Sequence, residues 1–319
     1  MVQREMVLRR DGRSLVRFGR IAGVLVVMMV STLWYASQRP GPVGAQVVPS
    51  ARAKGSVNLF YAGSLVGLVT QDLGPAFHKA TGYTINGLPG GSGELANEIK
   101  TGAQKADVFL SAAPSADLAL EGTKNGNWLH WYLPLGETPL LIGYNPHSRY
   151  AHLFRSEPWW KVLETKGFLL GRTDPALDPK GALTVQLVRK EAGRLHDPAL
   201  VQNVLGSSEN PAQVFPEETL VSRLQAGQLD AGFFFGIEAR VAKLPTVSTG
   251  ITLYGSYTVS IVRGAPDTGA AEALVRFLYS PEGQRILKAN GVQPVKPHIV
   301  GSKKAYPKAL RSLFARSKR

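Results

Sequence analysis

The sequence has 319 residues and no cysteine. Disulfide bonds, thiolate metal sites and cysteine nucleophiles are therefore excluded. A lipoprotein anchor is excluded as well, because it needs a cysteine just after the apolar segment of an export signal. Without cysteine, the redox compartment cannot be inferred from disulfide chemistry, so location has to be inferred from the N-terminus.

Signatures of catalysis are also missing. The chain has no Gly-x-Ser-x-Gly nucleophile elbow and no Gly-Lys-Ser/Thr phosphate loop. Glu217 and Glu218 are adjacent and point in different directions, so we expect an exposed helix start after Pro216 rather than a catalytic pair. The sequence predicts a protein that is not an enzyme and has no cofactor; an exported hydrolase is the alternative from another class. The histidines lack helical ligand spacing and are expected on the surface: His78, His130, His147, His152, His196 and His298.

Acidic residues are scarce at both ends of the chain, and the formal net charge is +14. Residues 1–45 carry a net +5 and residues 301–319 a net +7, which leaves +2 for residues 46–300. A nearly neutral body argues against nucleic-acid binding. Contact of the basic tail with an anionic lipid surface stays open.

Long apolar runs are limited to one near the N-terminus. Arginines precede an uncharged run of fifteen residues, 21–35, which is shorter than the ~20 residues that cross a bilayer. This pattern is typical of a secretory signal, and Val43–Ala45 supplies small residues for cleavage after Ala45. We expect residues 1–45 to be a signal peptide or an uncleaved anchor and 46–54 a linker, with the rest in the periplasm or at the cell surface.

The remaining chain alternates short apolar runs, small-residue turns and helical patterns. Runs at 57–61, 83–87 and 106–110 are β-like, and apolar residues recur at helical spacing after the first two. Further strands are expected at 139–144, 168–170, 229–235 and 257–262, a helix capped by Asp178 before Pro179, and a helix opened by Pro281. This alternation predicts an α/β fold with a largely parallel sheet, which binds ligands where strands lead into helix N-termini.

Two of these turns contain glycine and serine, at Gly63-Ser64 and at 90–93. A helix N-terminus offers free backbone N–H groups and a partial positive charge, and serine adds a hydroxyl donor. If both turns face one cleft, neutral dipoles can surround an anion. The alternative is that both turns are ordinary helix caps without a ligand.

Several segments resemble the molybdate/tungstate-binding proteins of ABC transporters. Residues 60–65 (FYAGSL) resemble the opening of that family, and 89–92 (PGGS) its second anion-binding turn. Residues 105–109 (KADVF) are similar to a strand of these receptors, and 174–181 to an Asp-Pro segment of the tungstate-type branch. The segment 278–284 (LYSPEGQ) resembles a helix entry of the wider superfamily.

This resemblance implies an α/β, two-lobed periplasmic-binding-protein fold of type II with two crossover hinge strands. The crossovers would lie near residues 136–144 and 245–258. Lobe one would be 55–137 plus 254–319, and lobe two 138–253. The implied partners are molybdate or tungstate and the membrane permease of an ABC transporter, for a chain acting as a monomer.

The resemblance also implies the ligand contacts. They would be Gly63 and Ser64 in the first turn, Ser92 in the second turn, Asp178 with Pro179 and Lys180, and Tyr257, for which Tyr254 is a competitor. No free metal ion is expected, although Asp178 would ligate the molybdenum or tungsten centre of the anion or serve only as a cap. Arg172 and Lys180 would either strengthen an anion site or be solvated surface charges.

One position departs from the family pattern. Where the tungstate-type branch has a glutamate, this chain has Phe234, and the next acid is Glu238. An expanded coordination of the metal centre by two carboxylates is therefore in doubt. The sequence does not separate molybdate from tungstate, and sulfate, phosphate or a ferric complex remain alternative ligands.

Overall fold

The computed structural model describes residues 54–315. Its strands form two parts of one sheet, here called half-sheets, and the first half-sheet includes β1 (Gly55–Ala62). The strands run in the order β2 (Tyr83–Gly90), β1, β3 (Val108–Ser111), β8 (Tyr254–Ile261) and the first part of β4 (Trp131–Tyr144). Side chains of β1 alternate between two cores, as period-2 geometry requires. Leu59 packs in the same cluster as helix α10, whereas Phe60 packs in the cluster that holds α3.

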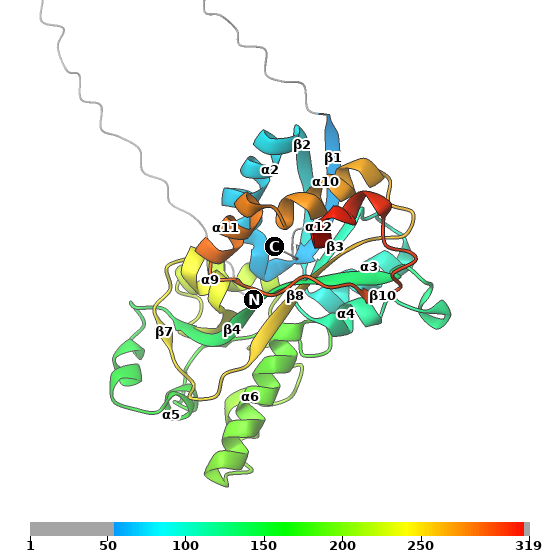
Figure 1. Ribbon diagram of the computed structural model, residues 1–319. Helices are drawn as coiled ribbons and strands as arrows, with labels where there is room; N and C mark the ends of the chain where they lie inside the picture. The colour runs from blue at the N-terminus through cyan, green and yellow to red at the C-terminus, as the bar shows by residue number, and fades with distance from the viewer. Residues whose placement is uncertain (1–53, 316–319) are drawn as a thin grey trace, which may run out of the picture. The chain divides into compact units, whose positions relative to one another are not determined.

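The second half-sheet uses the last part of β4 together with β6 (Ala231–Phe235), β5 (Leu170–Gly171) and β7 (Thr246–Val247). Phe233 and Phe235 lie in its core with Ile142. In Figure 1, helix α6 lies below β4, and α2, α10 and α11 lie above it. The helices and remaining short elements are η1 (Gly63–Leu65), α1 (Val66–Leu68), η2 (Val69–Leu73), α2 (Gly74–Thr81), α3 (Ser92–Thr101), α4 (Pro114–Leu118), η3 (Thr123–Asn125), η4 (Ala151–Arg155), α5 (Trp159–Leu163), α6 (Pro179–Leu195), α7 (Leu200–Leu205), η5 (Glu217–Thr219), α8 (Leu220–Gln225), α9 (Gly236–Val241), α10 (Thr268–Leu278), α11 (Pro281–Ala289), β9 (Gln293–Pro294), β10 (Val300–Gly301), η6 (Lys308–Leu310) and α12 (Ser312–Ala315).

Strand β4 belongs to both half-sheets. Residues 133–139 pair with β8 and residues 140–144 pair with β6, in both cases antiparallel. The return connection runs from β7, which pairs with β4, to β8. The chain therefore passes between the half-sheets at β4 and before β8, while the lobe boundaries at 137/138 and 253/254 stay a prediction.

The mixed α/β fold is confirmed, but the sheet is less parallel than the sequence indicates. Among the strands of residues 54–315, parallel pairing is limited to β1 with β2 and β3 and to β5 with β6. The pairs β3–β8, β4–β8 and β4–β6 are antiparallel, because β4 and β8 connect the half-sheets and run back along their neighbours. The strand expected at 168–170 lies at Leu170–Gly171.

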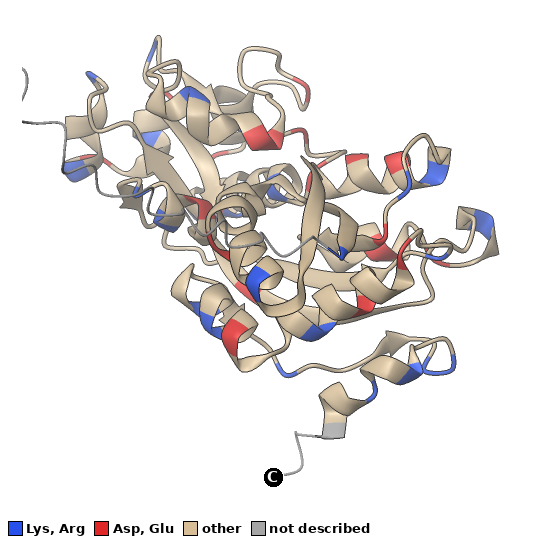
Figure 2. Cartoon of the chain, turned by 90° about the horizontal axis from the view of Figure 1, so that it is seen from above, with Lys and Arg blue, Asp and Glu red and all other residues tan. Residues whose placement is uncertain are grey.

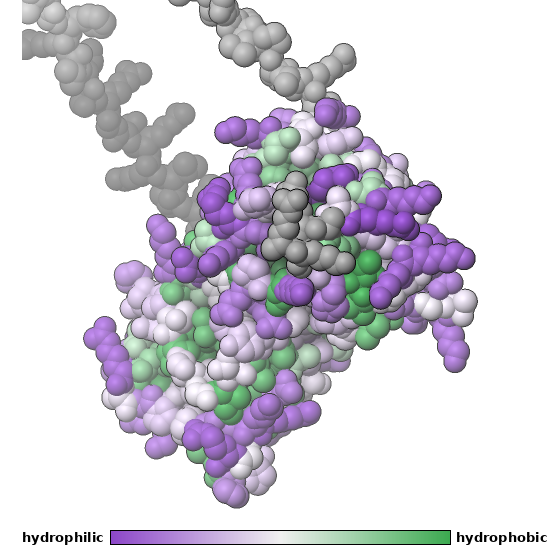
Figure 3. Space-filling view, in the orientation of Figure 1, coloured by the Kyte–Doolittle hydropathy of each residue, from purple (hydrophilic) through white to green (hydrophobic). Residues whose placement is uncertain are grey.

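No helix among residues 54–315 is long and apolar enough to span a membrane. The expected signal segment and most of the linker lie outside the described residues. Figure 2 shows basic and acidic residues of the described part interspersed rather than gathered by sign. On the face in Figure 3, apolar residues form several small patches among hydrophilic ones.

Candidate functional site

The first turn lies at the end of β1, where the backbone enters the helical stretch Gly63–Thr81. Ser64 is buried there, and its Oγ lies 3.0 Å from the Oη of Tyr257 on β8. Tyr257 is 1% exposed, whereas its competitor Tyr254 is 43% exposed. Of the two tyrosines, the structure thus brings Tyr257 to the predicted turn.

The second turn begins helix α3, with Gly91 as the N-cap residue and Ser92 as the first helical residue. The amides of Gly93 and Glu94 donate to the carbonyl of Leu177, at 2.9 and 3.2 Å. The Oγ of Ser92 accepts from the amide of Ala112 at 3.0 Å. Donors of this turn are therefore directed at the segment that precedes helix α6.

Asp178 caps helix α6, as the Asp-Pro pair predicts. Its Oδ1 accepts from the amides of Lys180 and Gly181 and from the hydroxyl of Thr173, at 2.8, 3.2 and 2.7 Å. Pro179 is the first helical residue, where its missing N–H costs nothing. The other carboxylate oxygen, Oδ2, lies 3.4 Å from the point that a Cβ on Gly91 would occupy, so the cap also contacts the second turn.

Lys180 is fully buried and pairs with Glu238 of helix α9. Its Nζ lies 2.8 and 3.0 Å from the two carboxylate oxygens of Glu238 and 3.5 Å from Oε1 of Glu217. Burial alone would lower the pKa of Lys180, but Glu238, Glu217 and Asp178 raise it overall. Lys180 is therefore a buried cation, and the alternative of a solvated surface charge is wrong.

Glu217 is the residue that the sequence analysis missed. Its expected exposure is wrong: the residue is 3% exposed, and only its neighbour Glu218 is exposed. A Cβ added to Gly63 would lie 2.6 Å from Oε2 of Glu217, so the carboxylate packs directly on the first turn. Burial raises the pKa of Glu217 well above its ordinary value, as do Asp178 and Glu238, against the lowering effects of Lys180 and the Ser64 amide.

Arg172 lies away from this cluster. It is fully buried and donates to the carbonyls of Ser207 and Ser208 at 2.7 and 2.9 Å, and to Oε1 of Gln213 at 3.1 Å. These acceptors follow the end of helix α7, where free carbonyls favour a cation. Its role is to hold this loop, so neither an anion contact nor a solvated surface charge describes it.

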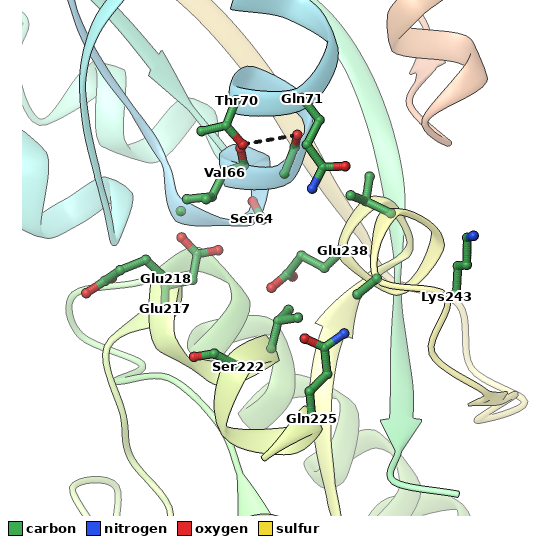
Figure 4. Close-up of a pocket in the computed structure, with 15 residues that line it drawn as sticks. Ser64, Val66, Thr70, Gln71, Glu217, Glu218, Ser222, Gln225, Glu238 and Lys243 are labelled. Carbon is green, nitrogen blue, oxygen red and sulfur yellow. Dashed lines mark hydrogen bonds between the residues drawn. The ribbon is translucent and has the colours of Figure 1, made fainter. Parts of the chain in front are cut away.

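A pocket of about 360 Å³ opens between the first turn and helices α8 and α9. In Figure 4, Ser64 lies above the pocket, Glu217 at its lower left and Glu238 on its right, where helix α9 runs. Ser92 does not line this pocket. The two turns are connected instead through the buried side chains of Asp178, Lys180 and Glu217, whose charges act on one another.

The charge of the cluster differs from that of a pocket built from neutral dipoles. Asp178, Glu217 and Glu238 would give two net negative charges against the single Lys180 if all four were ionised. Burial raises the pKa of each carboxyl, which opposes this state. All six histidines are exposed, as expected. Among the described residues, no three or more His, Asp or Glu side chains are arranged so that they could hold a metal ion.

Residues 57–293 match the family model of bacterial extracellular solute-binding proteins. The chain belongs to this family. Its members bind solutes outside the cytoplasm and are not enzymes, as the sequence predicts. The family match covers both half-sheets and every residue of the site described above.

Relatives of this solute-binding protein carry related names. A putative ABC transporter molybdenum-binding protein of Haloferax volcanii is 26% identical over 77% of this chain and 85% of its own length. The molybdate/tungstate-binding protein WtpA of Pyrococcus abyssi is 22% identical over 54% of this chain and 64% of its own length. An uncharacterised solute-binding protein of Petrotoga mobilis is 26% identical over 76% and 85%.

Solved structures share the fold. The periplasmic molybdate-binding protein of Azotobacter vinelandii superimposes with a TM-score of 0.57 at 18% identity, covering 75% of this chain and 100% of that one. The sulfate-binding protein SubI of Mycobacterium tuberculosis gives 0.57 at 17% identity, with 76% and 88% covered. The periplasmic-binding-protein fold expected from the sequence is therefore confirmed.

Proposed function

We propose that this chain captures a tetrahedral oxyanion, molybdate or tungstate, outside the cytoplasm and passes it to the membrane permease of an ABC importer. The observation that carries the proposal is the buried contact between Ser64 at the first turn and Tyr257 on β8, which lies beside the buried Lys180 cluster. Hydroxyl donors and a helix N-terminus at one buried point suit an anion. The names of the relatives support molybdenum or tungsten as the central atom.

The proposed contacts are Gly63, Ser64 and Tyr257 at the first turn, with Lys180 as the nearby cation. Ser92, Asp178 and Pro179 belong to the second turn and its neighbouring helix cap. The Oδ1 of Asp178 is used in capping helix α6, and its Oδ2 lies near Gly91. If Asp178 contacts the metal centre of the anion, Oδ2 is the oxygen that does so. We propose a monomer with no nucleic-acid partner, exported through residues 1–45.

Calorimetric titration of the full chain with molybdate, tungstate, sulfate and phosphate tests the proposal. We expect one site per chain with the highest affinity for molybdate or tungstate. Ser64→Ala should weaken binding by about 1–3 kcal/mol through a lost donor. Ser92→Ala should have a smaller effect, because Ser92 does not line the pocket and its Oγ accepts from the amide of Ala112. Ser156→Ala, which changes an exposed serine just after η4, serves as the matched control. A higher affinity for sulfate or phosphate would reassign the ligand, and turnover of a substrate would refute a binding role.

A further inference from the structure

The carboxylate of Glu217 lies where the first turn directs its donors. It comes from η5, just before helix α8, and Oε2 packs on Gly63 closely enough that no Cβ would fit between them. Within residues 54–315, neither carboxylate oxygen of Glu217 has a hydrogen-bond partner of full geometry, although both are buried. A buried acceptor left in this state is costly, so its position calls for an explanation.

Charged and polar groups from four elements face this carboxylate. Helix α6 contributes Lys180, with Asp178 at its cap, and helix α9 contributes Glu238. Strand β8 contributes the phenol of Tyr257, and η1 contributes the amide of Ser64. Lys180 already makes its two short contacts with Glu238, so its longer 3.5 Å contact to Glu217 is the one most easily exchanged.

An oxyanion at the first turn would need the same amide donors and the same face of Lys180. Two anionic acceptors cannot share those donors in a buried site, because like charges at close range repel strongly there. Resting on the proposed function, we infer that Glu217 is an internal competitor of the oxyanion: its carboxylate occupies the first turn and must leave or be neutralised when the anion binds. Glu217 thereby sets the affinity of the site.

This competition couples anion binding to proton uptake. The anion is favoured when Glu217 is neutral, so affinity rises as pH falls and is lost as pH rises. With one proton taken up, the Kd changes by up to about 10-fold per pH unit. Burial raises the pKa of Glu217 well above its ordinary value, so it takes up a proton at higher pH than an exposed carboxyl does.

The test compares the full chain with Glu217→Ala and Glu217→Gln in titrations with molybdate and tungstate, between about pH 6.5 and about pH 9. Repeating each titration in two buffers of different ionisation enthalpy measures the protons taken up. We expect Glu217→Ala to bind about 10-fold or more tightly at the highest pH, without proton uptake and with a nearly flat pH dependence. Glu217→Gln should also be flat, and it replaces the alanine variant if that variant fails to fold.

Glu218→Ala is the matched control, because it removes the same charge from the next, exposed position of η5. It should keep the proton uptake of the unmodified chain. Weaker or equal binding by Glu217→Ala, with proton uptake retained, would overturn the competition while leaving oxyanion binding intact. Binding of no anion by the unmodified chain or by either Glu217 variant would instead remove the proposed function and the competition together.

Discussion

The two strand-to-helix turns have similar sequences, but they face different hydrogen-bond acceptors. At the second turn, the helix amides donate to the backbone carbonyl of Leu177, a neutral acceptor held by the Asp178 cap. At the first turn, the facing acceptor is the Glu217 carboxylate, which can gain a proton or move away. Turns of similar sequence therefore need not form similar sites: the second turn is held by a backbone carbonyl, whereas the acceptor at the first turn can be exchanged for a ligand.

Removing Lys180 should have the largest effect on stability, because it is the cation that the buried carboxylates Glu238, Glu217 and Asp178 share. Lys180→Met leaves Glu238 and Glu217 buried without a cation, and loss of one partner of a buried pair costs about 3–5 kcal/mol. Its ordinary pKa is 10.5 and is raised in the fold, so the stabilisation is fully present below pH 10.5. Urea unfolding at neutral pH measures the loss.

The loss should shrink as pH falls, because the stranded carboxyls then take up protons and become neutral. Lys161→Met, at an exposed position of α5, provides the control and should change stability by less than about 0.5 kcal/mol. If the two variants had equal free energies of unfolding, Lys180 would not be needed to compensate buried carboxylates at the first turn.

Replacing the glycines of the two turns by alanine tests whether the atoms packed on each turn can move aside. A Cβ on Gly93 would lie 2.8 Å from the carbonyl oxygen of Leu177, which is backbone. We expect Gly93→Ala to cost about 1–3 kcal/mol through this overlap. Thermal unfolding measures the change, and Gly193→Ala is the control, because no atom lies within 4 Å and alanine should stabilise helix α6 there.

Gly63→Ala should cost less than Gly93→Ala. Its Cβ would meet the Glu217 carboxylate, the far end of a side chain, although the amide of Glu218 is also close at 3.1 Å. Replacing Glu217 by alanine should therefore reduce the cost of Gly63→Ala, a coupling visible in a double-mutant cycle. Additive effects would place Glu217 away from the turn.

How much of this site was predictable depends on how far apart its parts lie in sequence. The cap at Asp178 followed from an Asp-Pro pair, because capping joins residues two and three positions apart. The strands β1, β3 and β6 followed from apolar runs for the same local reason. The burial of Glu217 depends on the first turn, far away in sequence, and adjacent acids after a proline look like an exposed helix start.

The site residues that the family resemblance implied also differ in how much the sequence alone could show. Ser64, Lys180 and Tyr257 were named by motif, but only the fold shows that Tyr257 rather than Tyr254 reaches Ser64. The sequence also names Glu238 as the next acid after Phe234, but it does not show what either side chain contacts. Phe234, on strand β6, is buried in a separate small core, while Glu238, four residues later in helix α9, pairs with Lys180.

Asp178 tests whether the cap at the second turn is also a ligand contact. Asp178→Ala should destabilise the protein by about 0.5–2 kcal/mol, as the loss of other N-caps does. Asp178→Asn keeps a capping oxygen while removing the charge, so it should recover most of this stability. If the asparagine variant is stable but binds tungstate more weakly, the carboxylate contacts the anion; unchanged binding leaves capping as its whole role. Asp267→Ala, the cap of α10, is the matched control.

Tyr257→Phe should have the smallest effect on stability and isolates the hydroxyl contact of the first turn. The change removes one hydrogen bond to Ser64 and leaves the ring packed against Phe235, so we expect a loss of about 0.5–1.5 kcal/mol in urea unfolding. Ser64→Ala on its own should cost a similar amount, and the double variant less than the sum, because both remove the same bond. Tyr279→Phe removes a comparable bond, to the carbonyl of Pro134, outside the site. If both phenylalanine variants lose stability but only Tyr257→Phe loses oxyanion affinity, the Ser64–Tyr257 pair is set apart from an ordinary buried hydrogen bond, and equal affinities would reduce it to one.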